Sequence, residues 1–368
     1  MDDKTELYKQ VITTDNVANY GTAFMAHVNA KRGKRSYTQV QEFEENLRDN
    51  LHELIDEIQA GTYRTGDYIV ETINDGKKPR IIAKVPYKDR VVQWMLAIWY
   101  QPYYLELLSD NTHAAIPGRG IHSALRQAED YIRKDGNTWV LKLDIRKYFP
   151  HIHRATLLEM IREDIEDDNL FEVIKNIILD APDSIVDDEG TAAQDGIPIS
   201  NYWSQFMANR YMVEFTRWME TNGYTFCQYM DDIVVFSKDK EQLRRAKFEI
   251  EWYMERNLSL SLKANWQIFR PADRGLDFVG YRIFPDKTII RKDIYLKMTR
   301  SLRAIAKKIS AEKTKELTES QRCTVMSYLG WVCHCTSETR RFIYFKYFAP
   351  ILSQTHTPLS HKLTEYFK

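Results

Sequence analysis

The sequence predicts an α+β protein in which strands occupy the central part and helices surround and follow them. Three observations support this fold class. Apolar residues recur at helical spacing before residue 65, strand-like runs with turn signals lie between residues 68 and 291, and the segment after residue 291 has a wholly helical pattern. No internal repeat or low-complexity tract is visible in the sequence.

The first third of the chain predicts a helix, a hairpin and a second helix. Residues 38–60 carry apolar side chains at helical spacing, and Gly61 follows where a C-terminal stop is expected. Residues 68–85 alternate between polar and apolar side chains, with the hairpin signal Asn-Asp-Gly at 74–76. Residues 88–108 are rich in Trp, Tyr and Leu and predict a long helix.

The central part contains two predicted strand regions that are interrupted by aspartates. The segment TWVLKLDIRKYF (138–149) is an apolar strand with Asp144 in it, and residues 224–237 predict a hairpin with Asp231 and Asp232 at its tip. The other predicted elements are helices at about 154–180, 201–220 and 239–256, a short strand at 266–270 and a hairpin at 276–291.

The composition is typical of a globular, water-soluble chain. Its 368 residues are enough for two or three domains or lobes, and hydrophobic and charged residues make up 43% and 28%. No apolar run approaches the roughly 18 residues of a membrane span. The N-terminal MDDKTELYKQ is acidic and polar, unlike a signal peptide. These features predict a cytoplasmic protein.

The cysteines do not have the spacing of a zinc site. Cys227 and Cys323 are isolated, and the Cys-His-Cys run at 333–335 lacks the CxxC spacing of structural zinc ligands. Buried, reduced thiols are therefore the favoured interpretation.

The formal net charge is zero, but the charges are unevenly distributed. From Arg291 to the C-terminus there are 15 Lys and Arg against 6 Asp and Glu. A basic C-terminal part on a neutral chain indicates a local contact with a polyanion, and a solvated helical face is the alternative.

The aspartates are the residues that indicate a catalytic site. An Asp-Asp pair alone is usually a hairpin turn, and a lone Asp in a strand can be a structural ion pair. Found together, Asp144 and Asp231 on neighbouring strands could bridge a pair of Mg²⁺ ions, because hard divalent cations prefer oxygen ligands. This arrangement suits phosphoryl transfer, in which one ion activates the attacking hydroxyl and the other holds the leaving oxygen.

The order of the motifs resembles that of the reverse transcriptases, from about residue 30 to residue 345. The motifs are LDIRKYF at 143–149, YMDD at 229–232, KPR at 78–80 with Asp89-Arg90, GIP at 196–198 with Ser204-Gln205, LSLK at 260–263 and FVGY at 278–281. A YMDD string alone is only suggestive, but six motifs in the family's order make a chance match negligible.

The resemblance implies a right-hand polymerase fold with fingers, a palm containing an antiparallel sheet, and a helical thumb. The implied domains are an N-terminal helical extension and fingers (1–65), fingers and palm (66–285), and a helical thumb with a C-terminal tail (286–368). The implied activity is RNA-directed DNA synthesis with Mg²⁺, or alternatively Mn²⁺, as the metal.

The resemblance also implies the catalytic residues. Asp144, Asp231 and Asp232 are implied as metal ligands, and Lys263 as the general acid that protonates the pyrophosphate leaving group. Phe149, five positions after Asp144, is implied as the side chain that excludes a 2′-hydroxyl and so selects deoxynucleotides.

The implied nucleotide-binding residues lie in two motifs. Lys78, Arg80 and Lys84 can pair with triphosphate oxygens, and which of them makes the contact stays open. Ile199 and Gln205 belong to the motif that lies under the nascent base pair. Ile199 is apolar where most relatives have glutamine, so it cannot make the glutamine hydrogen bonds, and low fidelity or unusual template use is expected.

The subfamily stays open between two groups of bacterial reverse transcriptases. Ile199, the Ser204-Gln205 pair, the GYRI hairpin, and Gly330-Trp331 with Thr339 resemble the enzymes of diversity-generating retroelements. Ser200 stands where that group usually has glycine. Defence-associated (antiphage) reverse transcriptases vary at such positions and have a similar length.

The implied partners are an RNA template or dedicated noncoding RNA, a cDNA primer duplex, dNTPs and an accessory protein, with no membrane. The basic residues of the predicted helix at 291–309 suit a thumb that tracks a duplex. Two other functions stay open: template-independent or protein-primed DNA synthesis by the same site, and a catalytically inactive RNA-binding scaffold.

Overall fold

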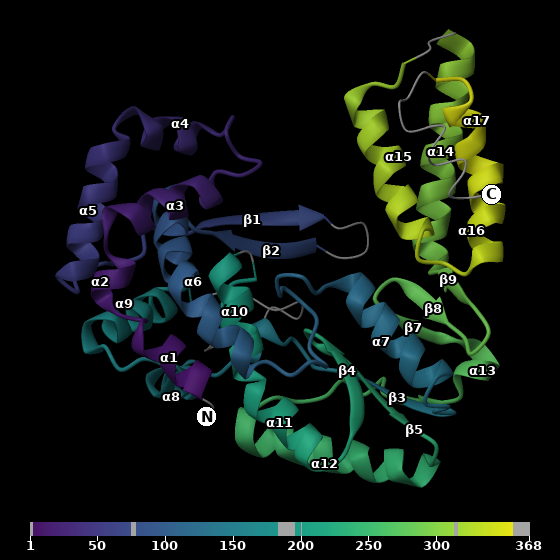
Figure 1. Ribbon diagram of the computed structural model, residues 1–368, viewed down its shortest axis with the longest axis horizontal. Coiled ribbons are helices and arrows are strands. Elements are labelled where there is room, and N and C mark those ends of the chain that lie inside the picture. The colour runs from purple at the N-terminus through teal and green to yellow at the C-terminus, as the bar shows by residue number, and fades with distance from the viewer. Residues whose placement is uncertain (1–2, 75–78, 183–195, 200, 313–315, 356–368) are drawn as a thin grey trace. The chain divides into compact units, whose positions relative to one another are not determined.

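The computed structural model describes residues 3–74, 79–182, 196–199, 201–312 and 316–355 (Figure 1). The chain forms two compact units. The first comprises Met1–Ile116, Leu143–Tyr224 and Ala246–Trp266, and the second comprises Pro117–Lys142, Thr225–Arg245 and Gln267–Lys368. Within the described ranges, no helix is both long enough and apolar enough to cross a membrane.

The first unit is largely helical and carries one two-stranded hairpin. Its helices are α1 (Asp3–Gln10), α2 (Thr14–Val17), α3 (Tyr20–Ala30), α4 (Thr38–Glu45), α5 (Leu47–Gln59), α6 (Tyr87–Leu107), α8 (Arg154–Asp164), α9 (Asp168–Leu179), α10 (Tyr202–Tyr211) and α11 (Val213–Thr221), with the 3₁₀ helix η1 (Phe149–His151). The hairpin strands are β1 (Ile69–Asn74) and β2 (Pro79–Lys84), paired from Ile69 opposite Lys84 to Asn74 opposite Pro79.

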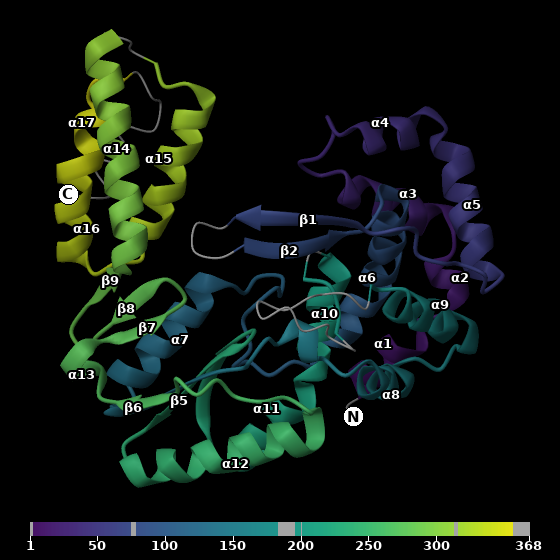
Figure 2. The ribbon, with the colours of Figure 1, turned by 180° about the vertical axis from the view of Figure 1, so that it is seen from behind.

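The long helix α6 lies at the centre of the first unit, where α3 and α10 pack against it (Figures 1 and 2). Its buried residues include Val91, Met95, Tyr100 and Tyr104, which lie on more than one face of the helix. A helix that is apolar on several faces is stable only when neighbours cover it. The predicted helix at 88–108 and the predicted hairpin at 68–85 are both confirmed.

The predicted helix at 38–60 is two helices, because Asn46 leaves the helical conformation with φ −124° and ψ 41°. The side chain of Asn50 donates a hydrogen bond to the Phe43 carbonyl (2.9 Å), satisfying an acceptor at the end of α4. The predicted stop at Gly61 is confirmed, since this residue has φ +67° and its N–H reaches the Ile58 carbonyl at 3.1 Å.

Two other predicted helices are also divided. The helix predicted at 154–180 breaks after Asp164, and α9 starts anew with Asp167 as its N-cap, accepting from the Leu170 N–H at 2.9 Å. The helix predicted at 201–220 breaks at Met212 into α10 and α11. Apolar periodicity continues through both breaks, so it does not reveal them.

The second unit contains two antiparallel sheets and the C-terminal helices. Its elements are α7 (Ile121–Arg133), β4 (Thr225–Tyr229), β5 (Asp232–Ser237), β6 (Gln267–Phe269), α13 (Pro271–Arg274), β7 (Leu276–Phe278), β8 (Tyr281–Ile283), β9 (Thr288–Ile290), α14 (Lys292–Glu312), α15 (Glu319–Val332), α16 (Ser337–Ile343), the π-helix η2 (Tyr344–Phe348) and α17 (Ala349–Leu352). Two elements, β3 (Trp139–Asp144) and α12 (Lys240–Leu258), extend across the division between the units. The strand orders are β4-β5-β3-β6 and β7-β8-β9.

The core of the second unit joins α7, both sheets and the C-terminal helices. Its fully buried members include Leu125 of α7, Val234 of β5, Tyr281 of β8, Leu302 of α14 and Phe348 of η2. The hairpin predicted at 276–291 is a three-stranded sheet, because the chain turns once more between β8 and β9. The predictions of a strand at 266–270, a helix at 239–256 and a helical C-terminal part are confirmed.

Gly280 is required by its backbone and by its neighbour. It has φ +87° in the turn between β7 and β8, and a Cβ there would lie 2.5 Å from the ring of Trp331. The Tyr281 hydroxyl donates to the Trp331 carbonyl at 3.0 Å. The FVGY motif therefore holds the end of α15 against the three-stranded sheet.

All four cysteines are free thiols. Cys227 and Cys335 are buried as predicted, and burial raises the pKa of Cys335 to about 12. The prediction of buried thiols is wrong for Cys323, which lies exposed on α15.

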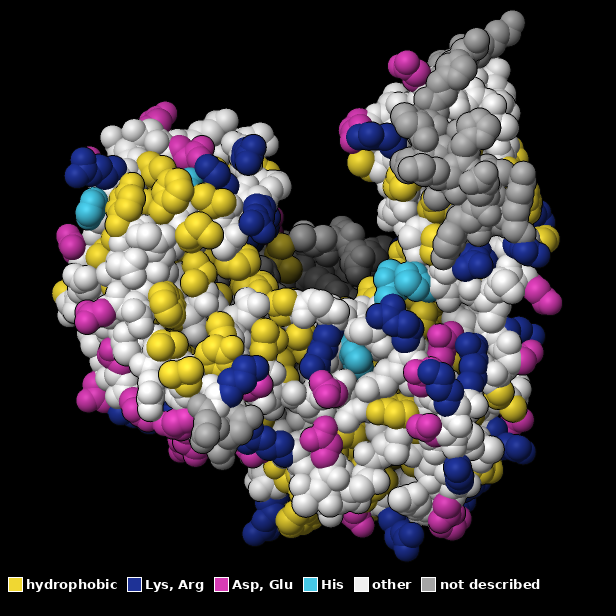
Figure 3. All heavy atoms as spheres, viewed as in Figure 1, with side chains coloured by type: hydrophobic (Ala, Val, Ile, Leu, Met, Phe, Trp, Pro, Cys, Tyr) yellow, Lys and Arg dark blue, Asp and Glu magenta, His cyan; other side chains and the backbone are white. Residues whose placement is uncertain are grey.

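On the face of the first unit shown in Figure 3, hydrophobic side chains gather over α3 and α6. The exposed apolar residues of α3 are Tyr20, Phe24 and Met25, of which Tyr20 and Phe24 stack with their ring centroids 6.4 Å apart.

Candidate active site

Asp144, the last residue of β3, lies against Lys263. The Lys263 ammonium is 2.5 Å from Asp144 Oδ1, and the Lys263 N–H donates to the Asp144 carbonyl at 2.8 Å. An isolated bridge between Ile145 and Leu262 and a hydrogen bond from the Arg146 N–H to the Ser261 carbonyl (2.8 Å) continue this pairing. The structure thus brings together two of the predicted catalytic residues, from the LDIRKYF and LSLK motifs, through backbone pairing as well as charge.

The YMDD motif forms the tight turn between β4 and β5. Tyr229 is paired with Asp232, so Met230 and Asp231 are the two turn residues. Met230 is in the left-handed region with φ +58°, a conformation that costs about 1 kcal/mol or more for a residue other than glycine. The buried Gln228 side chain donates to the Met230 carbonyl at 3.0 Å and so holds this turn.

Asp232 is the first residue of β5, and its Oδ2 lies 3.3 Å from the Lys142 ammonium. The same ammonium donates to the Asp277 carbonyl at 2.6 Å. The predicted hairpin with the Asp pair at its tip is confirmed, with Asp231 in the turn and Asp232 at the first strand position. In the sheet, β5 is hydrogen-bonded to β3, the strand that ends at Asp144.

The donor chemistry of these aspartates fits a hard divalent cation. The side chains of Asp144 and Asp232 are 28% and 25% exposed, and each carboxylate is compensated by a lysine ammonium. Such partly exposed carboxylates are the oxygen ligands that Mg²⁺ takes together with substrate phosphates. Within the described parts of the chain, no three or more His, Cys, Asp or Glu side chains converge as a metal site would require.

Phe149 lies in η1, which is tied to the GIP motif by backbone hydrogen bonds. The Ile197 N–H donates to the Phe149 carbonyl at 3.0 Å, and the Gly196 N–H donates to the Ile152 carbonyl at 3.1 Å. A Cβ on Gly196 would lie 2.7 Å from the Pro150 carbonyl oxygen, so only glycine permits this close approach. The half-buried Phe149 ring is therefore positioned directly beside the segment that carries Ile199.

The segment 196–199 is fixed from both ends by side chains. The buried Arg154 guanidinium donates to the Gly196 carbonyl at 2.8 Å and to the Ala181 carbonyl at 3.0 Å. Gln205 donates from its amide to the Ile199 carbonyl at 2.9 Å. The Ile199 side chain itself is 41% exposed. The structure thus joins Ile199 and Gln205, the two predicted residues of this motif.

The predicted triphosphate contacts lie on the β1–β2 hairpin. Lys84 pairs with Glu71 across the two strands, which compensates its charge. Arg80 belongs to β2, where its side chain is outside the described structure, and Lys78 lies outside the described residues.

Asp89 has a structural position in α6. It is fully buried, accepts from the Tyr63 hydroxyl at 2.7 Å and accepts from the Gly66 N–H at 3.2 Å. Burial raises the pKa of Asp89 above its ordinary value, although these hydrogen bonds act in the opposite direction. Asp89 therefore holds the segment that leads into β1 rather than facing a nucleotide.

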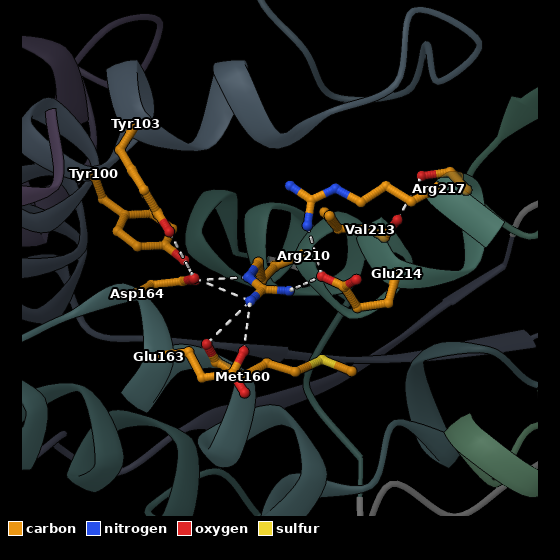
Figure 4. A network of polar contacts seen from close by, with 10 residues as sticks. Tyr100, Tyr103, Met160, Glu163, Asp164, Arg210, Val213, Glu214 and Arg217 are labelled. Carbon is orange, nitrogen blue, oxygen red and sulfur yellow. Dashed lines mark hydrogen bonds and ion pairs between the residues drawn. The ribbon is translucent and has the colours of Figure 1, made fainter. Parts of the chain in front are cut away.

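A buried ion pair connects the helices around this part of the first unit (Figure 4). Arg210 of α10 donates to Asp164, the last residue of α8, with contacts of 2.6 and 3.0 Å. The hydroxyls of Tyr100 and Tyr103 from α6 donate to the same carboxylate. Burial alone would lower the pKa of Arg210, but the hydrogen bonds and charge of Asp164 raise it overall. The pair thus ties α6 and α8 to the helix that also carries Gln205.

Two polar residues of the site are missing from the sequence-based assignment. Lys142 is two positions before Asp144 in β3, and this spacing places both side chains on one face of the strand, which is the signal that could have identified it. Arg154 had no such signal, since its partners, the Ala181 and Gly196 carbonyls, are distant from it in the sequence.

The mixed helices and antiparallel sheets, together with the motif residues, define a polymerase of the right-hand class. The family model described as "Reverse transcriptase (RNA-dependent DNA polymerase)" matches residues 73–283. The chain therefore belongs to the reverse transcriptase family, a family of RNA-directed DNA polymerases that use divalent metal ions.

Two curated proteins illustrate the relationship. Protein YkfC of Escherichia coli (strain K12) is 23% identical over 237 residues, which cover 53% of this chain and 61% of that protein. An uncharacterized 91 kDa protein in the cob intron of Schizosaccharomyces pombe is 28% identical over 110 residues, covering 30% of this chain and 13% of that protein. The chain thus spans less than two thirds of either relative.

Solved structures with similarity include a telomerase and a Cas6-RT-Cas1–Cas2 complex. Apo telomerase from Candida tropicalis is 12% identical, with a TM-score of 0.49, covering 83% of this chain and 62% of that chain. A chain of the partial Cas6-RT-Cas1–Cas2 complex is 17% identical, with a TM-score of 0.39, covering 66% of this chain and 42% of that chain.

Proposed function

We propose that the protein is an RNA-directed DNA polymerase that extends a DNA primer by nucleotidyl transfer. The observation that carries this proposal is the pairing of Asp144 with Lys263. This pairing brings the motif of a predicted metal ligand and the motif of the predicted general acid into one site. A chain that had lost polymerase activity would have no need to keep this pair, the YMDD turn and the close approach at Gly196 together.

In this proposal Asp144, Asp231 and Asp232 hold two divalent cations, Mg²⁺ or Mn²⁺. Bound there, the ions would lower the pKa of the primer hydroxyl and compensate charge on the leaving pyrophosphate. Lys263 holds a proton within reach of the same position and can donate it to the leaving group. Lys142 holds Asp232 in place from the second unit's sheet.

The other site residues position the nucleotide. Phe149 excludes a 2′-hydroxyl, and Ile199 and Gln205 lie under the nascent base pair, where the Gln205 amide donates to the Ile199 carbonyl. Lys78, Arg80 and Lys84 are the candidate triphosphate contacts, and Lys84 also pairs with Glu71. The proposed domains are an N-terminal helical extension and fingers at 1–65, fingers and palm at 66–285, and a helical thumb with a C-terminal tail at 286–368.

We infer that the template is a dedicated noncoding RNA and that the biological context is a diversity-generating retroelement, with an antiphage defence system as the competing context. The apolar, partly exposed Ile199 supports this inference, because it removes a side chain that hydrogen-bonds near the nascent pair. Sequencing of cDNA made in cells distinguishes the contexts by its template, start point and error pattern.

Primer extension tests the proposed activity. Purified protein, an RNA template with an annealed DNA primer, dNTPs and Mg²⁺ are expected to yield template-directed DNA, and EDTA is expected to abolish the product. Without any product under Mg²⁺ or Mn²⁺, the polymerase proposal is wrong. A product whose sequence does not follow the template would instead support template-independent synthesis.

Replacing Phe149 by valine is expected to raise ribonucleotide incorporation relative to deoxynucleotide incorporation by at least about tenfold, because the smaller side chain leaves room for the 2′-hydroxyl. The measurement is kcat/KM for rNTP and dNTP in single-nucleotide extension. Phe248→Val is the matched control, since Phe248 is 65% exposed on α12. An unchanged rNTP/dNTP ratio in Phe149→Val, with dNTP extension intact, would remove Phe149 from this role.

A further inference from the structure

The second unit contains a hollow of about 310 Å³ between the three-stranded sheet and the C-terminal helices. It is bounded by β8, β9, α14 and α16, of which α14 and α16 run side by side in both ribbon views (Figures 1 and 2). None of the residues assigned to nucleotidyl transfer lines it. Its volume is at the lower end of the range that proteins use for small organic ligands.

The lining of the hollow is apolar and aromatic. The buried Ile290 and Ile343 are part of the lining, together with the rings of Tyr295 and Phe342. Phe342 is 56% exposed, so one of these rings is open to a ligand. Tyr295 is held in place by a 3.1 Å hydrogen bond between its hydroxyl and that of Tyr347.

Two cations also line this apolar space. Arg282 of β8 and Lys292 of α14 are both exposed. In the part of the chain that the structure describes, neither lies within ion-pair distance of an Asp or Glu, whereas the nearby Arg291 is paired with Asp277. Asp277 lies opposite Arg282 in the β7–β8 pair but forms its ion pair with Arg291. Two exposed positive charges beside an apolar hollow favour an anionic ligand with an apolar, planar part.

We propose that this hollow binds a nucleotide, with the base between the Tyr295 and Phe342 side chains and the phosphate at Arg282 and Lys292. Aromatic rings next to cations are the combination that binds single nucleotides without sequence preference, through stacking and charge. The Thr339 hydroxyl in the lining can hydrogen-bond to a base edge. The nucleotide is either free in solution or unstacked from a bound RNA, and both sources present the same chemistry.

The test is a binding measurement in EDTA, so that it does not depend on the proposed metal site or on polymerase activity. The probes are a short fluorescent single-stranded RNA, measured by polarisation, and AMP, measured by direct calorimetric titration. Thr339→Trp fills the hollow without removing a charge, Phe342→Ala removes one ring, and Arg282→Glu reverses one cation. Each variant is expected to weaken binding about tenfold.

The matched controls are Phe345→Ala and Lys134→Glu. Phe345 is 50% exposed on η2, the Lys134 side chain is 72% exposed at the end of α7, and neither residue lines the hollow. Both are expected to bind RNA within about twofold of wild type. Circular dichroism checks that Thr339→Trp, Phe342→Ala and Arg282→Glu are folded.

The outcomes separate the two sources of the nucleotide. Loss of RNA affinity in the three variants assigns the hollow to a nucleotide of RNA. Loss of AMP binding with unchanged RNA affinity assigns it to a free nucleotide. If RNA and AMP binding are both unchanged in all three variants, or fall equally in the controls, the proposal is wrong.

Discussion

Replacing Asp231 by alanine is expected to lower the rate of primer extension at least about 1,000-fold. Metal ions at such a site contribute several kcal/mol of charge stabilisation in the transition state, and each 1.36 kcal/mol is a factor of ten in rate. Asp231 is one of two residues in the β4–β5 turn, so the substitution does not remove a strand pair. The measurement is single-turnover extension with saturating dNTP.

Asp286→Ala is the matched control for this experiment. Asp286 belongs to the same unit, its side chain is 74% exposed, and it is not part of any motif. Its extension rate is expected to equal that of wild type. RNA binding by Asp231→Ala is expected to be retained, which separates loss of chemistry from loss of fold. Extension by Asp231→Ala at the wild-type rate would contradict the assignment of Asp231 to the catalytic site.

The type and order of the elements were predictable from the sequence, but the places where helices break were not. Apolar spacing continues through Asn46 and Met212, yet a helix ends at each of these residues and another begins after it. Each break depends on local partners, such as the bond from Asn50 to the Phe43 carbonyl. Apolar periodicity shows which face of a helical segment is buried. When two consecutive helices bury the same face, the break between them leaves the apolar pattern unchanged.

The candidate site was also only partly predictable from the sequence. The resemblance of three contiguous strings to family motifs predicted Asp144, Asp231 and Lys263 as site residues. Their supporting residues depend on how distant segments are paired. Arg154 reaches the carbonyls of Ala181 and Gly196, and neither contact has a signature in the sequence around position 154. A single sequence therefore does not reveal residues whose partners are distant along the chain.

Replacing Asp164 by alanine is expected to lower the free energy of unfolding by about 3–5 kcal/mol, because the buried Arg210 would lose its compensating charge. The Arg210 and Asp164 side chains are only 3% and 2% exposed, so water cannot replace the lost carboxylate. The hydroxyls of Tyr100 and Tyr103 would lose their acceptor as well. The measurement is urea unfolding followed by circular dichroism, with the midpoint compared at constant slope.

Glu163→Ala tests whether this loss comes from burial or from the number of ion pairs around Arg210. Glu163 precedes Asp164 and lies 3.9 Å from the same guanidinium, but its side chain is 79% exposed. Solvent screening limits such a pair to about 1 kcal/mol or less, so the midpoint of Glu163→Ala is expected to stay close to wild type. Equal losses in the two variants would show that Asp164 acts as one of several interchangeable charges. A large loss confined to Asp164→Ala would show that one buried carboxylate joins α6, α8 and α10.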